Sequence, residues 1–197
     1  MTGGEIRAFI AVRPGPGIKE AATHAISRLA GGGEPVKWVE ADNLHLTLAF
    51  LGNIASESVT AARRALTAAA REESGFTLRT GKLGAFPSSQ RPRVLWLGFS
   101  AGSQELKHLA TAIRWELETA GLGYDPKAFR PHLTLGRVKG DSRGQCWLEL
   151  DGISVSGEDF VDTVCLFRSV LTSQGPIYTV LHEARLGEGS RTQTSMV

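Results

Sequence analysis

The chain has 197 residues, of which 42% are apolar and 21% charged, so it has the composition of an ordinary globular protein and not of a disordered or fibrous one. Its 22 basic and 20 acidic side chains give a formal net charge of +2, which fits a local basic patch but not a chain that coats nucleic acid electrostatically. The two cysteines lie outside any CxxC pattern, and no apolar stretch approaches the ~20 residues that span a bilayer. We therefore expect a cytoplasmic protein that does not associate with membranes.

The predicted elements alternate between strands and helices without the regular rhythm of a parallel βαβ fold. Strands are predicted at 7–12, 37–40, 44–51, 76–86, 93–99, 132–138, 155–173 and 177–186, and helices at 18–29, 56–73 and 103–120. Gly52 and Asn53 are expected to turn the chain out of the strand at 44–51, and we interpret the alanine-rich helix at 56–73 as an ordinary amphipathic helix. This order favours an α+β fold with mixed or antiparallel sheets. Residues 1–186 are predicted to form one domain, and the polar tail 187–197 is predicted to be disordered.

A tetrapeptide occurs twice, as His45-Leu46-Thr47-Leu48 and as His132-Leu133-Thr134-Leu135, each inside a predicted strand. Side chains alternate between the two faces of a strand, so each copy places its histidine and threonine on one face and its leucines on the other. The leucines are expected to face a core. If two similar lobes carry the two copies, the two His-x-Thr pairs meet across a cleft.

Such a cleft suits the chemistry of a phosphodiester. An imidazole with a pKa near 6.5 exists in both protonation states near neutral pH, so one ring can accept a proton from water while the other donates one to the leaving oxygen. The hydroxyls of Thr47 and Thr134 can donate hydrogen bonds to the non-bridging phosphate oxygens, where negative charge develops. This chemistry requires neither a metal nor an organic cofactor.

The repeated motif and its surroundings resemble the two-histidine phosphoesterases, specifically the branch of RNA 2',3'-cyclic phosphodiesterases, also called 2'-5' RNA ligases. The resemblance covers nearly the whole chain up to about Leu186. It is found in 7–12, in Trp38 with 43–52, in 84–87, in 92–96, in 129–137, and in Leu166, Ser169, Leu171, Gly175, Pro176 and Tyr178.

This resemblance implies a fold of two pseudo-symmetric lobes, each a mostly antiparallel sheet flanked by helices, with the active site in the cleft between them. It implies hydrolysis of RNA 2',3'-cyclic phosphate ends to 2'-phosphomonoesters, with His45 as proton donor to the 3' oxygen and His132 as proton acceptor from water. The implied substrates are RNA ends such as those of tRNA halves, or nucleoside 2',3'-cyclic phosphates. The resemblance also implies 2'-5' ligation of tRNA halves.

Four further residues are candidate RNA contacts: Phe50, Arg91, Arg130 and Arg137. We place Phe50 on the catalytic face of its strand, where it can stack on a base. Strict alternation puts Arg137 on the leucine face, so its contact with substrate requires the strand to bend. Arg130 precedes the second motif, and Arg91 lies in a polar, basic turn.

Other functions remain open from the residues alone. A related enzyme could act on 2'-5' oligonucleotides or on a cyclic nucleotide-sugar phosphate, and a non-catalytic module could hold tRNA ends. The intact pair of histidines favours an enzyme over a module that only binds. A metal hydrolase fits less well, since no HExxH motif or carboxylate–histidine cluster supplies further ligands. We expect a monomer.

Overall fold

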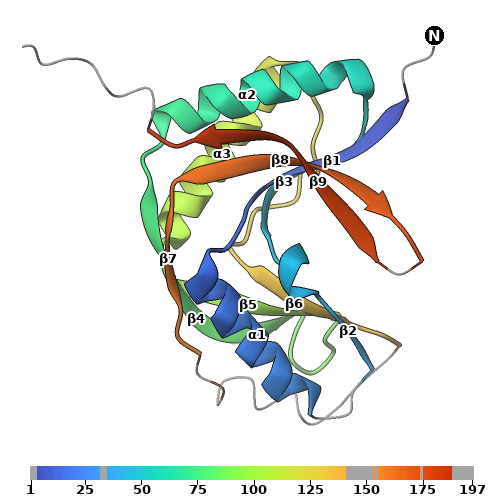
Figure 1. The fold of residues 1–197 in the computed structure, drawn as a ribbon, viewed down its shortest axis with the longest axis vertical. Coiled ribbons are helices and arrows are strands. Elements are labelled where there is room, and N and C mark those ends of the chain that lie inside the picture. The colour runs from blue at the N-terminus through green and yellow to red at the C-terminus, as the bar shows by residue number, and fades with distance from the viewer. Residues whose placement is uncertain (1–3, 32–34, 141–152, 154, 174, 188–197) are drawn as a thin grey trace, which may run out of the picture.

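The computed structural model describes residues 4–31, 35–140, 153, 155–173 and 175–187. They form two separate antiparallel sheets that face one another in the two halves of Figure 1. The strands are β1 (Glu5–Val12), β2 (Val36–Trp38), β3 (Leu46–Ala55), β4 (Phe76–Phe86), β5 (Val94–Ala101), β6 (Leu133–Val138), β7 (Glu158–Val161), β8 (Thr163–Leu171) and β9 (Pro176–Arg185). The helices are α1 (Pro16–Ala30), α2 (Val59–Glu72) and α3 (Ser103–Thr119), with short 3-10 turns at Ala41–Asn43 and Ser56–Ser58. The expected α+β, two-lobed architecture is confirmed.

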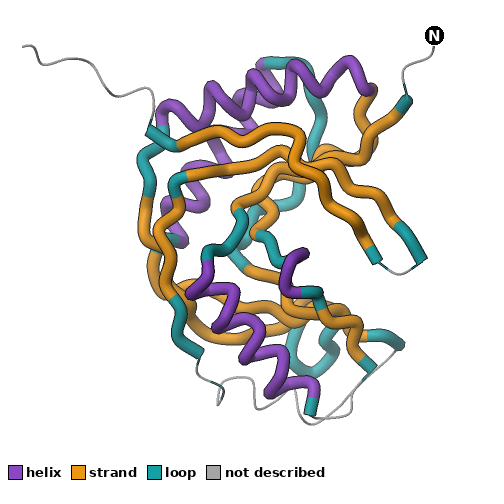
Figure 2. Tube along the Cα trace, viewed as in Figure 1, coloured by secondary structure: helices purple, strands orange, loops and turns teal. Residues whose placement is uncertain are grey.

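The lobe drawn at the top of Figure 1, here the upper lobe, is built on the sheet β3-β1-β8-β9. Helices α2 and α3 pack together, and they contact this sheet through β8 and β9 and through β3 respectively. The lower lobe is built on the sheet β2-β6-β5-β4-β7, which α1 covers through contacts with β4, β6 and β7. Figure 2 shows α2 lying along the outer side of the upper sheet, away from the lower lobe.

The leucines of the repeated tetrapeptide lie in the core, as the alternation argument predicts. Leu46 and Leu48 are buried in the upper lobe, and Leu133 and Leu135 are buried in the lower lobe. All four belong to one apolar cluster that also contains the buried faces of the three helices. Because burying such a side chain stabilises a fold by about 1.5–3 kcal/mol, these leucines fix which face of each strand is left for the histidine and threonine.

The predicted strand at 155–173 is wrong as a single element. The chain forms β7 in the lower lobe, where Val161 pairs with Phe76, and then β8 in the upper lobe, where Cys165 pairs with Ala11. Asp162 separates the two strands, and its carbonyl accepts a hydrogen bond from the N–H of Leu186. Residues that favour strands lie on both sides of Asp162, which is itself a residue type depleted in strands, but nothing in this pattern specifies that the chain passes from one sheet to the other.

The predicted end of the first motif strand is also wrong. Instead of turning the chain away, Gly52 lies within β3, which continues to Ala55, and it pairs with Ala8 of β1. Gly52 has a φ of 71°, which glycine adopts without strain, and the pairing register shifts at this point. The chain therefore forms a bulge at Leu51, next to this glycine, and not a turn.

No helix in the described part of the chain is long and apolar enough to cross a membrane. The residues from 188 onward, which include most of the tail predicted to be disordered, lie outside the described residues, as does Cys146. The boundary of the single domain near residue 186 therefore stays a prediction.

Candidate active site

A cavity of about 570 Å³ opens between the two lobes and contains both copies of the motif. The upper lobe contributes β1, β3, β8 and β9 to its wall, and the lower lobe contributes β2 and β6. Its lining residues are Arg7, Phe9, Lys37, Trp38, Val39, Glu40, Asn43, His45, Thr47, Phe50, His132, Thr134, Arg137, Ser169, Leu171, Thr172, Gly175, Pro176, Ile177 and Tyr178. The structure thus brings together His45, Thr47, His132 and Thr134, whose side chains were predicted to meet.

The two motif strands share a β-bulge directly after the threonine. On β3, Thr47 pairs with Ala11 and Ala49 with Ile10, so Leu48 is the extra residue. On β6, Thr134 pairs with Trp96 and Gly136 with Leu95, so Leu135 is the extra residue. The two bulges occur at equivalent positions of the repeated tetrapeptide.

Each bulge reverses the alternation of the residues that come after it. Without a bulge, Phe50 and Arg137 would both share the face of the leucines. With it, both line the cavity beside the histidine and threonine of their own strand. Phe50 therefore lies on the same side of its strand as His45 and Thr47, and the bend that Arg137 requires is present. Contact of either residue with RNA stays a prediction.

The two histidine rings are held by the same backbone contact. Nδ1 of His45 lies 2.7 Å from the carbonyl oxygen of Asn43, and Nδ1 of His132 lies 2.6 Å from that of Arg130, in each case two residues earlier. A carbonyl oxygen only accepts hydrogen bonds, so Nδ1 of each ring carries the proton. No described residue is bonded to Nε2 of either ring, so in the neutral form this nitrogen is free to accept a proton from a reactant.

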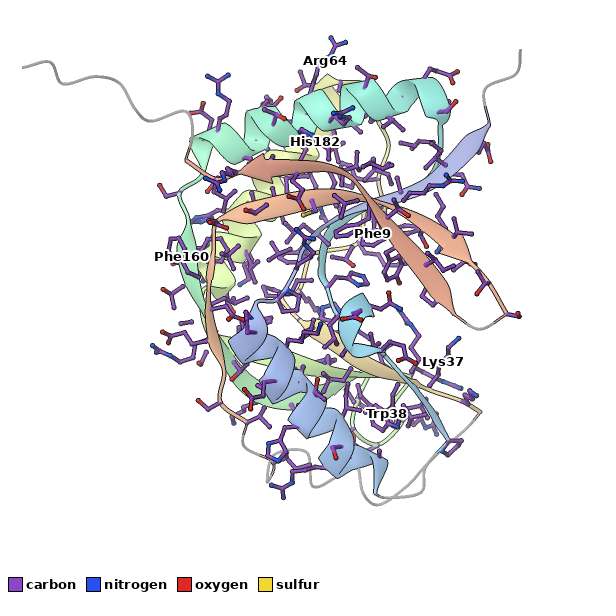
Figure 3. The ribbon with its side chains drawn as sticks, viewed as in Figure 1. Phe9, Lys37, Trp38, Arg64, Phe160 and His182 are labelled. Carbon is purple, nitrogen blue, oxygen red and sulfur yellow. The ribbon has the colours of Figure 1, made fainter. Side chains whose placement is uncertain are left out.

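The rings around the two histidines differ. His45 lies 4.8 Å from the ring of Phe9 and 5.0 Å from that of Tyr178, measured between centroids, and these three rings contact one another. His132 has one such neighbour, Phe86, at 5.2 Å in an edge-to-face arrangement. In Figure 3, Phe9 lies on the side of the upper sheet that faces the lower lobe, as its position in the cavity lining requires.

Burial lowers the pKa of both histidines below the ordinary value of 6.5, because it disfavours the charged imidazolium. The carbonyl contacts of Asn43 and Arg130 oppose this effect, since they stabilise the protonated ring. The guanidinium of Arg137 lowers the pKa of both histidines further, and His132 also lowers that of His45. The two rings and Arg137 therefore form one interacting group of charges.

Cationic side chains give the cavity a positive character. Arg7, Lys37 and Arg137 line it, and Glu40 is the one acidic residue among the described lining residues. The guanidinium of Arg7 lies 4.7 Å from the centroid of the Phe50 ring, which is a cation–π contact. Among the described residues no group of three or more histidine, cysteine, aspartate or glutamate side chains is arranged to hold a metal ion. The arrangement suits an anionic ligand with an aromatic or apolar part.

The other two candidate RNA contacts lie outside the cavity lining. Arg130 is exposed, and its guanidinium sits 5.8 Å from the centroid of the Phe86 ring, which also contacts His132. Arg91 is exposed in the turn between β4 and β5. Their contact with RNA stays a prediction.

Several lining residues were not singled out as site residues from the sequence. Arg7 and Lys37 are ordinary basic residues of strands, and only strand pairing brings them to the cavity. Trp38, Ser169 and Tyr178 were noted as part of the resemblance, and that was the one available signal for them.

The comparisons with known proteins agree with this geometry. The family model described as LigT like phosphoesterase matches residues 13–96, which include the first motif and end before the second. An RNA 2',3'-cyclic phosphodiesterase of Aquifex aeolicus is 38% identical over 154 residues, covering 77% of this chain and 82% of that protein. One from Thermotoga maritima is 33% identical over 186 residues, covering 93% and 97%.

Solved structures extend the likeness to the second motif. The crystal structure of TT0787 of Thermus thermophilus superimposes with a TM-score of 0.78 at 29% identity, covering 92% of this chain and 98% of that one. That of Escherichia coli LigT complexed with 3'-AMP has a TM-score of 0.73 at 28% identity, covering 93% and 99%. The chain therefore belongs to the family of LigT-like two-histidine phosphoesterases.

Proposed function

We propose that the protein hydrolyses the 2',3'-cyclic phosphate at RNA ends to a 2'-phosphomonoester, by acid–base catalysis between His45 and His132. The observation that carries this proposal is the matched pair of rings in one cavity. Each has Nδ1 committed to a backbone carbonyl and Nε2 left without a described partner. The names of the relatives from Aquifex aeolicus and Thermotoga maritima support the substrate class.

The proposed reaction is an in-line displacement at phosphorus. A water oxygen attacks the phosphorus while its proton passes to Nε2 of His132. The bond from phosphorus to O3' breaks, and O3' takes the proton carried by Nε2 of His45, so the phosphate remains on O2'. After the reaction His132 is protonated and His45 is neutral, and exchange with solvent restores the starting state. Each positioned proton transfer typically contributes ~10²–10⁴-fold to the rate.

The side chains beside the histidines supply the remaining stabilisation. Thr47 and Thr134 share the cavity with the two rings, and their hydroxyls donate to the non-bridging oxygens of the phosphate. Arg137 places a positive charge where negative charge develops in the transition state. Phe50, already stacked under Arg7, offers its ring to the base.

The cavity is large enough for a nucleotide, since small-molecule sites are commonly ~300–1,000 Å³ in volume. Both motifs and all the groups used in the reaction come from a single chain. This supports action as a monomer, and the RNA substrate agrees with the cytoplasmic location expected from the composition.

The test is the identity of the product. Purified protein is incubated with 2',3'-cyclic AMP and with a short RNA that ends in a 2',3'-cyclic phosphate, in the presence of EDTA. We expect 2'-AMP and the 2'-phosphorylated RNA, identified by chromatography against both phosphate isomers. A 3'-phosphate product would show that the substrate binds in the opposite sense or that the histidines exchange roles.

Two other results would point to different functions. Loss of activity in EDTA that a divalent ion restores would replace this mechanism with a metal-dependent one. Tight binding of the RNA end without turnover over a range of pH would favour the binding module.

A further inference from the structure

A second hollow lies on the outside of the upper lobe, between α2 and the outer strand β9. Its volume is about 420 Å³, and it is lined by Thr60, Arg63, Arg64, Thr67, Ala68, Arg71 and His182. None of these residues lines the cavity between the lobes. We call this hollow the α2–β9 groove.

The basic residues of the groove form a stripe along α2. Thr60, Arg63 or Arg64, Thr67 and Arg71 are spaced by three or four residues, so they lie along one side of the helix. At 1.5 Å per residue the stripe from Thr60 to Arg71 is about 16 Å long. This length spans several consecutive phosphates of a nucleic acid strand, which are spaced by ~3.4 Å along a helix axis.

The three arginines of the groove are free to bind a ligand. Each is exposed, and in the part of the chain that the structure describes none of them forms an ion pair. Glu183, which neighbours His182 in sequence, is paired with Arg13 and does not line the groove. A row of unpaired guanidinium groups in a hollow without a lining carboxylate is complementary to phosphate oxygens, which guanidinium binds in a bidentate manner.

Side chains from two elements shape the floor of the groove. The hydroxyl of Thr67 donates to the carbonyl of Arg63 at 3.0 Å, and it lies 2.8 Å from Nε2 of His182 on β9. Since the hydroxyl proton is directed to the carbonyl, Nε2 of His182 donates to the threonine oxygen. Figure 3 shows Arg64 projecting outward from α2 and His182 where β9 passes beneath this helix.

The groove is connected to the active site by a single strand. The pairing register shifts between Val180 and His182, which marks a bulge at Leu181. As a result, Tyr178 and Val180 pack on the cleft side with Phe9, whereas His182 pairs with Leu166 on the helix side. His182 lies four positions after Tyr178 along the strand, a distance of about 13 Å. The edge strand β9 therefore contributes residues to both the cavity between the lobes and the groove.

We propose that the α2–β9 groove binds the sugar–phosphate backbone of the RNA body, while the cyclic end lies in the cavity between the lobes. This proposal rests on the proposed function and extends it, because it makes RNA a better substrate than a mononucleotide. Helix α2 is amphipathic as expected, with Leu66 and four alanines on its buried side, and the proposal gives its exposed arginines a role in binding.

The experiment compares two triple variants of the full-length protein that lose the same charge. The groove variant is Arg63→Gln with Arg64→Gln and Arg71→Gln. The control is Arg28→Gln with Lys82→Gln and Lys107→Gln, three exposed cations that line neither cavity. Binding of a labelled RNA stem-loop with an ordinary 3'-hydroxyl is measured by fluorescence anisotropy over a series of salt concentrations. Turnover is measured with the same stem-loop ending in a cyclic phosphate and with 2',3'-cyclic AMP.

We expect the groove variant to raise Kd and KM for the stem-loop about tenfold, and the control to change them less than about twofold. The slope of log K against log salt should become shallower by about 2 in the groove variant, since each lost phosphate contact removes ~0.7–0.9. Turnover of 2',3'-cyclic AMP should stay within about twofold of the original in both variants. Replacement of the three arginines by lysine should retain most of the salt dependence.

Equal effects of the two triple variants, or unchanged RNA binding in the groove variant, would overturn the proposal. The second result would leave the groove to a different anionic partner, such as an acidic protein. Circular dichroism melting of each variant shows whether a loss of RNA binding reflects unfolding. If the triple groove variant is unfolded, the single variant Arg64→Gln tests the proposal in its place, and we expect it to make the salt slope shallower by a smaller amount. The anisotropy measurement does not require catalysis, so failure of the proposed hydrolysis is distinguishable from failure of this proposal.

Discussion

Strands β3 and β6 follow the same design in the two lobes. A histidine immediately before each strand is held by the carbonyl two residues earlier, a threonine lies two residues after the histidine, and a bulge brings the residue five positions after the histidine onto the same face. The two strands differ in this last residue, which is Phe50 on β3 and Arg137 on β6. His45 is also enclosed by two aromatic rings, whereas His132 contacts one. The repeat positions two equivalent imidazoles, and the side chains around these two rings differ.

The largest expected effect comes from removing either histidine. His45→Ala and His132→Ala should each reduce kcat/KM by about 10²–10⁴-fold, because each removes one proton transfer. The double variant should be scarcely slower than either single one, since groups that act as a unit are not additive. Steady-state kinetics with 2',3'-cyclic AMP measures this, with His24→Ala, on the exposed surface of α1, as the control. Near-normal turnover by one single variant would disprove the paired mechanism.

Replacement of Arg137 tests the charged side of the comparison. Arg137→Gln should lower kcat/KM on the order of 100-fold, as it loses a charge-assisted hydrogen bond worth up to about 3 kcal/mol. Arg130→Gln is the matched control, because Arg130 lies near His132 but outside the cavity lining. With a mononucleotide substrate the control should be nearly unchanged. Equal losses of kcat/KM in the two variants would mean that the total positive charge near the site, and not the position of Arg137, determines the rate.

The threonines test whether the two lobes contribute equally to phosphate binding. Thr47→Ala and Thr134→Ala should each cost on the order of 1.5–3 kcal/mol in transition-state stabilisation, the typical value for a hydrogen bond to a charged group. Thr→Ser at either position should retain much more activity, since it keeps the hydroxyl. The ratio of kcat/KM between the alanine and serine variants is the measurement. If serine were as harmful as alanine, packing and not hydrogen bonding would explain the loss.

The smallest expected effect is a shift of the pH profile. Hydrolysis needs one imidazole neutral and the other protonated, so kcat/KM against pH should be bell-shaped. Burial and Arg137 lower the pKa of both rings in the free enzyme, which places the maximum below pH 6.5. Arg137→Gln removes a positive charge that disfavours both imidazolium forms, so both limbs should move to higher pH. A maximum above pH 7, or a shift to lower pH in the variant, would contradict this account.

The repeated tetrapeptide was enough to predict the centre of the site, because a period of two separates its leucines from His45, Thr47, His132 and Thr134. The strand residues beyond the threonines could not be placed in the same way. Leu48 and Leu135 are ordinary strand residues in the sequence, and their roles as bulges appear only when the strands pair. Strict counting therefore placed Arg137 on the wrong face.

Residues outside the motif depend on still longer-range contacts. Arg7 and Tyr178 reach the cavity because β1 and β9 both flank β8 in the upper sheet, which no local pattern indicates. The passage between sheets at Asp162 was missed for the same reason. Local periodicity predicts which face of a strand is buried. It does not predict which other strand pairs with it, because that depends on residues far apart in the sequence.

The order of the strands has a consequence for synthesis of the protein. β1 forms the interior of the upper sheet, and its partner β8 is separated from it by about 150 residues of sequence. Such non-local pairing is slow to form, since a long loop must close before any contact is gained. A chain still on the ribosome can pair β1 with β3. The part of the cavity wall that Ser169 and Tyr178 form is missing until β8 and β9 have left the ribosome. The cavity is therefore complete only after β8 and β9 have been synthesised, so a nascent chain that carries both histidines but not these strands lacks part of the cavity wall.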